Sequence, residues 1–105
     1  MTDEIEKRIG ECGEAIFDFH YGIHEAQSYI REGKWDDAKR MVDSWVHGSL
    51  GKMATVCKVD IVKALEHVSM SRSAIDRRDN MLAINRLNAS IGEMLWQFSK
   101  KKLGR

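Results

Sequence analysis

The sequence predicts an all-α protein, an up-and-down bundle of about four helices, on three observations. Proline, the strongest helix breaker, is absent from all 105 residues. Apolar residues recur at alternating steps of four and three over long segments, a spacing that lines one face of a helix. Glycine, Asn and Asp remain to form short turns, which favour antiparallel neighbours. We expect residues 1–105 to form a single domain.

The first helix is expected from Thr2 or Asp3 to near Gly33. Acidic residues in its first turn suit the positive end of a helix dipole. One apolar stripe runs along nearly its whole length and predicts a buried seam, formed by Ile5, Ile9, Cys12, Ile16, Phe19, Ile23, Ala26 and Ile30.

A second helix is expected to begin at Trp35 and to be short. Gly48 and Gly51 follow it, and each glycine inside a helix costs about 1 kcal/mol relative to alanine. The sequence therefore predicts a break or kink at 47–51. A short helix would leave part of the seam of its three longer neighbours uncovered, so we expect dimerisation of two copies to complete the bundle.

The third and fourth helices are predicted over 52–77 and 80–101. The third is apolar over a wide arc, which is typical of a helix buried on most sides. Asp79 is expected to cap the fourth, which carries an apolar stripe. No Gly or Pro marks the boundary at Asp79, so 52–101 could instead be one continuous rod that needs a dimer to bury its face.

Charge and cysteine content narrow the classes of partner and compartment. With 17 basic and 16 acidic residues the formal charge is +1, which gives no overall field for nucleic acid or an anionic membrane. No run of 18 apolar residues is present, so a membrane span is not expected. Cys12 and Cys57 fall on apolar stripes and are expected to be free thiols, as in a reduced cytoplasmic protein.

The favoured function is a non-enzymatic binding or regulatory module that attaches to a partner protein. Phe17, Tyr21 and His24 fall at helical spacing away from the main seam, and exposed aromatic side chains are enriched at binding surfaces. Two tryptophans of the second helix, Trp35 and Trp45, are the other candidate contacts. No catalytic signature or cofactor motif is found.

Two alternatives of other classes stay open. Nucleic acid could bind a local basic patch, made of Arg72, Arg77, Arg78 and Arg86. A metal ion could bind His20 and His24, whose spacing allows two imidazoles on one helix to reach the same ion. The positions beside this pair, however, are hydrocarbon, whereas bundle metal sites need further inward ligands.

Overall fold

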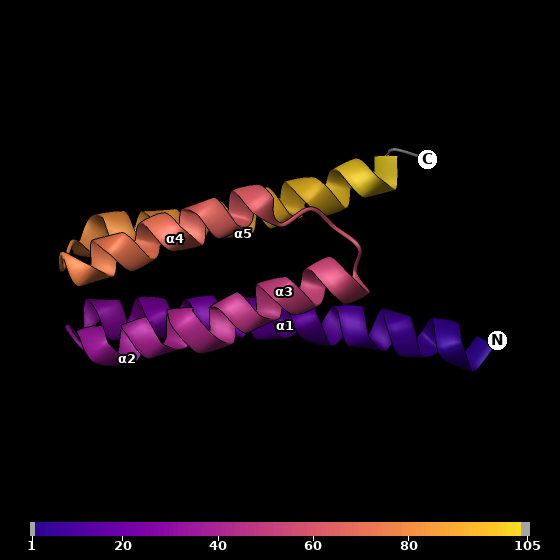
Figure 1. The fold of residues 1–105 in the computed structure, drawn as a ribbon, viewed down its shortest axis with the longest axis horizontal. Helices are drawn as coiled ribbons and strands as arrows, with labels where there is room; N and C mark the ends of the chain where they lie inside the picture. Colours follow the sequence, from indigo (N-terminus) through magenta and orange to yellow (C-terminus); the bar gives the residue numbers. More distant parts are fainter. Residues whose placement is uncertain (1, 104–105) are drawn as a thin grey trace.

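The computed structural model describes the backbone of residues 2–103 and the side chains of residues 7 and 9–100. Its elements follow the order α1 (Thr2–Arg31), α2 (Trp35–Arg40), the π-helix η1 (Met41–Val46), α3 (His47–Val56), α4 (Val62–Asp76) and α5 (Asn80–Leu103). Figure 1 shows that α2, η1 and α3 form one continuous rod antiparallel to α1, and that α4 and α5 form a second antiparallel hairpin. The predicted all-α bundle is confirmed.

The two hairpins turn by the same backbone device. At the end of α1, Gly33 has a φ of 75°, and the N–H of Lys34 donates to the Tyr29 carbonyl at 2.8 Å. At the end of α4, Arg78 has a φ of 57°, and the N–H of Asp79 donates to the Ala74 carbonyl at 2.8 Å. Both are Schellman motifs, in which a residue in the left-handed region ends the helix. The continuous rod over 52–101 is therefore wrong.

The boundary between the second and third helices differs from the prediction. The predicted break or kink at 47–51 is wrong, because Gly48 and Gly51 lie inside α3, where a Cβ at either position would meet open space. The chain breaks instead at 57–61, where Asp60 Oδ1 accepts the N–H of Val62 at 2.9 Å and α4 begins. The second helical rod is thus not short, so the argument for a homodimer from a short second helix does not hold. The dimer itself stays a prediction.

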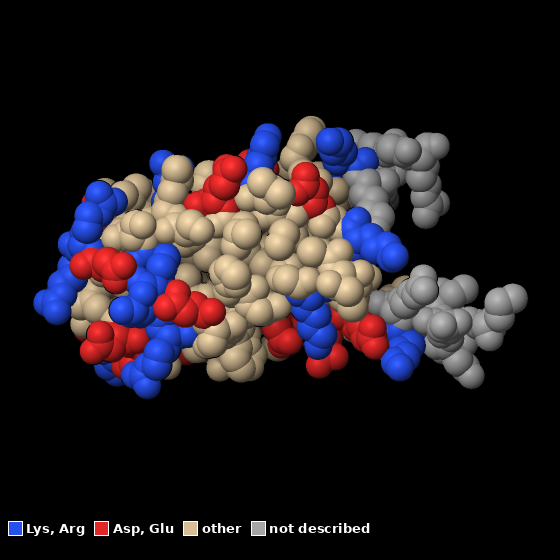
Figure 2. Space-filling view, viewed as in Figure 1, with Lys and Arg blue, Asp and Glu red and all other residues tan. Residues whose placement is uncertain are grey.

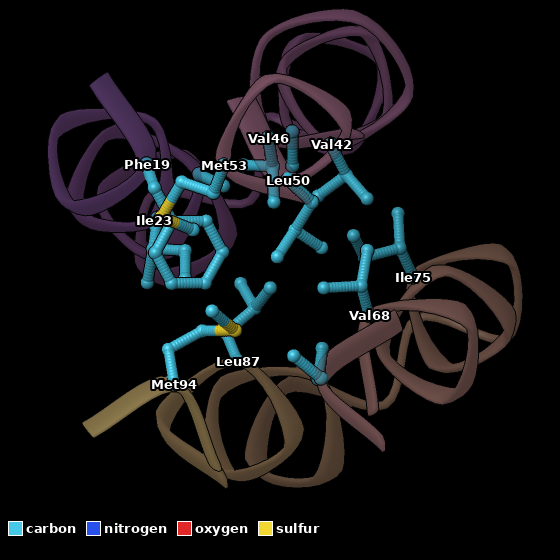
Figure 3. Packing of buried hydrophobic residues seen from close by; sticks show 14 of the residues in the cluster. Phe19, Ile23, Val42, Val46, Leu50, Met53, Val68, Ile75, Leu87 and Met94 are labelled. Carbon is cyan, nitrogen blue, oxygen red and sulfur yellow. The ribbon is translucent and has the colours of Figure 1, made fainter. Parts of the chain in front are cut away.

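The core lies between the two hairpins. Figure 3 shows Phe19 and Ile23 of α1 pointing toward Leu87 and Met94 of α5, with side chains of the other two rods completing the layer. Among buried polar groups, Gln27 Nε2 donates to Asn88 Oδ1 at 2.7 Å and to the Ile84 carbonyl at 3.3 Å. This pair of bonds fixes α1 against α5 and satisfies a polar group that would be costly to bury alone.

The apolar stripe of α1 is only partly buried. Its members from Phe19 to Ile30 are fully inside, but Ile9 is 68% exposed. Cys12 is bonded to Cys57, just past the end of α3, so residues before Cys12 extend beyond the rod that would cover them. Ile5 lies outside the described side chains. The prediction of one buried seam over the whole helix is therefore wrong at Ile9.

The cysteines are not free thiols. Cys12 of α1 and Cys57 form a disulfide across a sequence separation of 45 residues, with their Cα atoms 5.0 Å apart. The expectation of two reduced thiols is wrong, and the cytoplasmic localisation that rested on it loses its support, because disulfides persist mainly in oxidising compartments. Within residues 2–103, no helix combines the length and the apolar character that crossing a bilayer requires.

Candidate functional site

Three of the predicted contact residues form one exposed group, which we call the aromatic surface: Phe17, Tyr21 and Trp45. The rings of Phe17 and Tyr21 stack with centroids 6.5 Å apart, and the Tyr21 and Trp45 centroids lie 5.3 Å apart. Phe17 is 69% exposed, Tyr21 40% and Trp45 44%. Two helical rods that are distant in sequence therefore present one continuous aromatic row.

Trp45 is held in place from both sides of its indole. Its Nε1–H donates to the backbone carbonyl of Asp18 on α1 at 2.8 Å. Gly22, one turn further along α1, lies under the ring: a Cβ at this position would be 2.6 Å from Trp45 Cδ1. The absence of a side chain at 22 thus permits the indole to lie close against the α1 backbone.

The helix that carries Trp45 is wound irregularly at this point. η1 is a π-helical stretch within an otherwise α-helical rod, a feature frequent at functional sites. Ser44 and Ser49 flank Trp45 and donate their hydroxyls to carbonyls four residues earlier, each at 2.6 Å, a bond that often bends helices. The wider winding keeps Val42 and Val46 in the core while Trp45 emerges on the surface.

A hollow of about 220 Å³ adjoins the aromatic surface through Trp45. Its walls come from α1, α2 and η1, and they combine apolar with charged side chains: Tyr29, Asp37, Arg40, Met41, Ser44 and Trp45. Arg40 and Asp37 form an ion pair at 2.6 Å along this wall. An aromatic row beside an apolar recess with a charged border resembles the core and rim of protein interfaces.

The two other predicted contacts lie elsewhere. His24 is exposed on α1, one turn beyond Tyr21, and is not part of the ring stack. Trp35 is half-buried against the core at the turn between α1 and α2. It lines a separate hollow that also contains Arg78. The structure therefore brings together Phe17, Tyr21 and Trp45, and not Trp35.

The predicted arginine patch is divided. Arg72 is engaged by two carboxylates, donating from Nε to Asp43 at 2.7 Å and from Nη1 to Asp76 at 2.6 Å. Burial opposes the charged form of Arg72, but these two hydrogen bonds outweigh it and raise its pKa. The hydrogen bond from Arg72 in turn lowers the pKa of Asp76.

The remaining arginines occupy two different hollows. Arg77 and Arg86 share one between α4 and α5, whereas Arg78 lies in the hollow beside Trp35. Figure 2 shows acidic and basic side chains interleaved at the end of the bundle where the hairpins turn, and a broad band with few charges over the middle of this face. The face in view presents no continuous basic track of the kind that follows a phosphate backbone.

The two histidines of the predicted metal pair, His20 and His24, lie in different surroundings. His20 is half-buried, its Nδ1–H donates to the Ile16 carbonyl at 3.0 Å, and its ring meets Phe19 edge-on at 5.8 Å. His24 is exposed. Among the described side chains, no three of His, Cys, Asp or Glu stand close enough together to hold a metal ion. His20 therefore has a structural contact, and the described surroundings add no third ligand to the pair.

Gly22 is the residue that sequence reasoning missed at this site. Gly22 lies between Tyr21 and Ile23 inside the first helix, but Gly10 and Gly13 lie in the same helix and a Cβ at either would meet open space, so the sequence alone did not single out Gly22. The hydrogen bond to the Asp18 carbonyl left no trace in the sequence.

Comparison of the chain with models of protein families, with curated proteins and with solved structures finds no match.

Proposed function

We propose that this chain is a small helical binding module that attaches to a partner protein through the aromatic surface of Phe17, Tyr21 and Trp45. The observation that carries the proposal is the continuity of the row: three exposed rings from two rods, with neighbouring centroids 5.3 and 6.5 Å apart. An isolated exposed ring is common on protein surfaces, whereas contiguous exposed apolar groups mark interaction sites.

The physical advantage of this surface is that part of it is ordered before binding. Immobilising a flexible side chain at an interface costs about 0.5–1.5 kcal/mol. Trp45 is already fixed by its hydrogen bond to Asp18 and by contact over Gly22. Burial of aromatic area then contributes at about 25 cal/mol per Å² with little offset from ordering. Tyr and Trp are for this reason frequent anchors in interfaces.

The neighbouring hollow gives the partner a second point of attachment. An apolar side chain of the partner fits the recess beside Trp45 and Met41, and a polar side chain meets the Asp37–Arg40 pair at its border. The proposed role is non-enzymatic and needs no cofactor, since association draws only on burial and hydrogen bonding.

Affinity capture with matched variants tests the proposal. Tagged wild-type protein and the double variant Phe17→Ala with Tyr21→Ala are incubated with a nuclease-treated native lysate, and recovered proteins are quantified by mass spectrometry. Trp96→Ala is the matched control, because Trp96 is a 58% exposed aromatic on α5. We expect the same partner with wild type and control and its loss with the double variant. Equal recovery of the partner by wild type, the double variant and Trp96→Ala would contradict the proposal.

Two further outcomes separate the alternatives. Circular dichroism must show unchanged helicity in the double variant; a loss of helix would mean that the two rings support the fold. Proteins that are recovered only when nuclease is left out would favour the alternative hypothesis, in which the chain binds nucleic acid. The homodimer expected from the sequence is tested by sedimentation equilibrium: a wild-type dimer that dissociates in the double variant would make this surface a self-interface and overturn the partner-protein proposal.

A further inference from the structure

A second recess lies on the other hairpin, between α4 and α5. It has a volume of about 240 Å³ and is lined by Met70, Ser73, Arg77, Leu82 and Arg86. None of these residues belongs to the aromatic surface, which is built by α1 and η1. Figure 1 shows the two hairpins as separate layers of the bundle. The recess is therefore a distinct surface.

The two arginines of this recess are not neutralised by carboxylates. Within the described side chains, neither Arg77 nor Arg86 forms an ion pair, in contrast to Arg72, which contacts two. Arg86 instead donates from Nη1 to the Nδ1 atom of His67 at 3.4 Å, a long hydrogen bond to an imidazole nitrogen. Two guanidinium groups thus border one hollow with most of their donors available.

Two of the other three residues that line the recess, Met70 and Leu82, are apolar, and the third is Ser73. Met70 is 48% exposed, and Leu82 is half-buried with its inner side packed on the core. A guanidinium beside a thioether and an isobutyl group offers a charge contact and a desolvated contact at the same place. The complement of this pattern is an apolar side chain with a carboxylate next to it, because the carboxylate pairs with arginine while the apolar group fills the recess.

From this complementarity we infer that the recess between α4 and α5 is a docking site for an acidic peptide segment, in which a leucine-like side chain enters the hollow and flanking carboxylates pair with Arg77 and Arg86. The occupant is a peptide and not nucleic acid for two reasons. A phosphate backbone is followed by several cations in a row, and only two are available here. Arg72 is already paired with two carboxylates, and Arg78 lies in the other hollow, which Asp36 and Asp37 also line.

Site-resolved NMR tests the inference on the whole chain. The probe is a short capped peptide with leucine between glutamates; a matched peptide carries lysine in place of each glutamate, and a short single-stranded oligonucleotide is the third ligand. The methyl groups of Met70 and Leu82 report on the recess, and those of Met41 report on the aromatic side. We expect the glutamate peptide to shift Met70 and Leu82 and the lysine peptide to leave them unchanged.

Single substitutions then assign the charges. Arg77→Gln and Arg86→Gln should each weaken the glutamate peptide about tenfold, which is near the weak end of what one hydrogen bond between charged groups contributes. Arg78→Gln is the matched control, since it removes the neighbouring arginine outside the recess. Overturning results are an absence of shifts with the glutamate peptide, equal shifts with the lysine peptide, equal weakening by Arg78→Gln, or shifts of the same methyl groups by the oligonucleotide alone. None of these results bears on the proposed function of the aromatic surface, which is tested by its own variants.

Discussion

Gly22 of α1 makes room for the indole of Trp45: a Cβ at position 22 would be 2.6 Å from Trp45 Cδ1 and 3.0 Å from Val46 Cγ2. Atoms this close must move, and the hydrogen bond from Trp45 to the Asp18 carbonyl depends on the indole staying where it is. The close approach of η1 to α1 and the display of Trp45 on the surface are therefore consequences of one missing side chain.

Gly22→Ala should destabilise the fold, although alanine is the better helix former. Overpacking costs about 1–3 kcal/mol, and helix propensity returns about 1 kcal/mol. Gly13→Ala in the same helix is the control: its Cβ meets open space, so only the propensity gain of about 1 kcal/mol remains. Urea unfolding measures the free energy of unfolding of both variants. A change in the same direction for Gly22→Ala and Gly13→Ala would refute the role of Gly22.

Reduction of the disulfide should lower stability without changing the fold class. Cys12 and Cys57 close a long loop that includes the whole second rod, and a cross-link of this kind contributes about 2–4 kcal/mol. We expect the double variant Cys12→Ser with Cys57→Ser to unfold at lower denaturant, and wild type in reductant to match it. Free thiols found by mass spectrometry in non-reduced protein would contradict the cross-link.

Arg78→Gly should stabilise the hairpin of α4 and α5. Arg78 has a φ of 57°, a conformation that costs a residue with a side chain about 1 kcal/mol relative to glycine. Greater freedom of glycine in the unfolded chain reduces the gain, so we expect an increase of about 0.5 kcal/mol in the free energy of unfolding. Arg77→Gly is the control and should be destabilising or neutral, because Arg77 is still in the right-handed region. A loss of stability in Arg78→Gly would rule out strain at this turn.

The Arg72–Asp76 pair predicts a response to acid. The hydrogen bond from Arg72 lowers the pKa of Asp76 below its ordinary value. The stabilisation from this pair is therefore present above about pH 4, the unfolded pKa of an aspartate, and is lost as the pH falls through the lower folded value. In Arg72→Gln the pKa of Asp76 should rise toward the ordinary value, which a carboxyl carbon NMR titration measures. An unchanged Asp76 titration would contradict the pairing.

The helix boundaries that could be predicted include two that carry a local signal in the sequence: Gly33 after α1 and Asp79 before α5. Asp79 Oδ1 accepts the N–H of Leu82 at 3.2 Å and begins α5 as predicted. The glycine signal at 48 and 51 failed because burial of Leu50 and Met53 outweighs about 1 kcal/mol of propensity per glycine. The same error hid the disulfide. With a predicted break at 47–51, Cys57 falls on the third helix and is not placed at the end of the second rod, where it pairs with Cys12.

The aromatic surface was predicted in part. Helical spacing places Phe17 and Tyr21 away from the seam, and both are exposed. The position of Trp45 beside them depends on η1, where π-helical winding departs from the period of 3.6 residues on which the sequence pattern rests. A pattern based on a regular helix places Trp45 on the same apolar face as Val42 and Val46. Only the folded chain shows that its indole lies across Gly22 in contact with Tyr21.

Photo-crosslinking from the aromatic surface tests the central proposal most directly. Phe17 is replaced by p-benzoylphenylalanine, which keeps an aromatic ring at an exposed position, and the protein is irradiated in nuclease-treated native lysate. The same photo-reactive residue in place of Trp96 is the control. The proposal predicts a discrete protein adduct from position 17 that is absent from position 96. No adduct from position 17, or the same adducts from both positions, would contradict it.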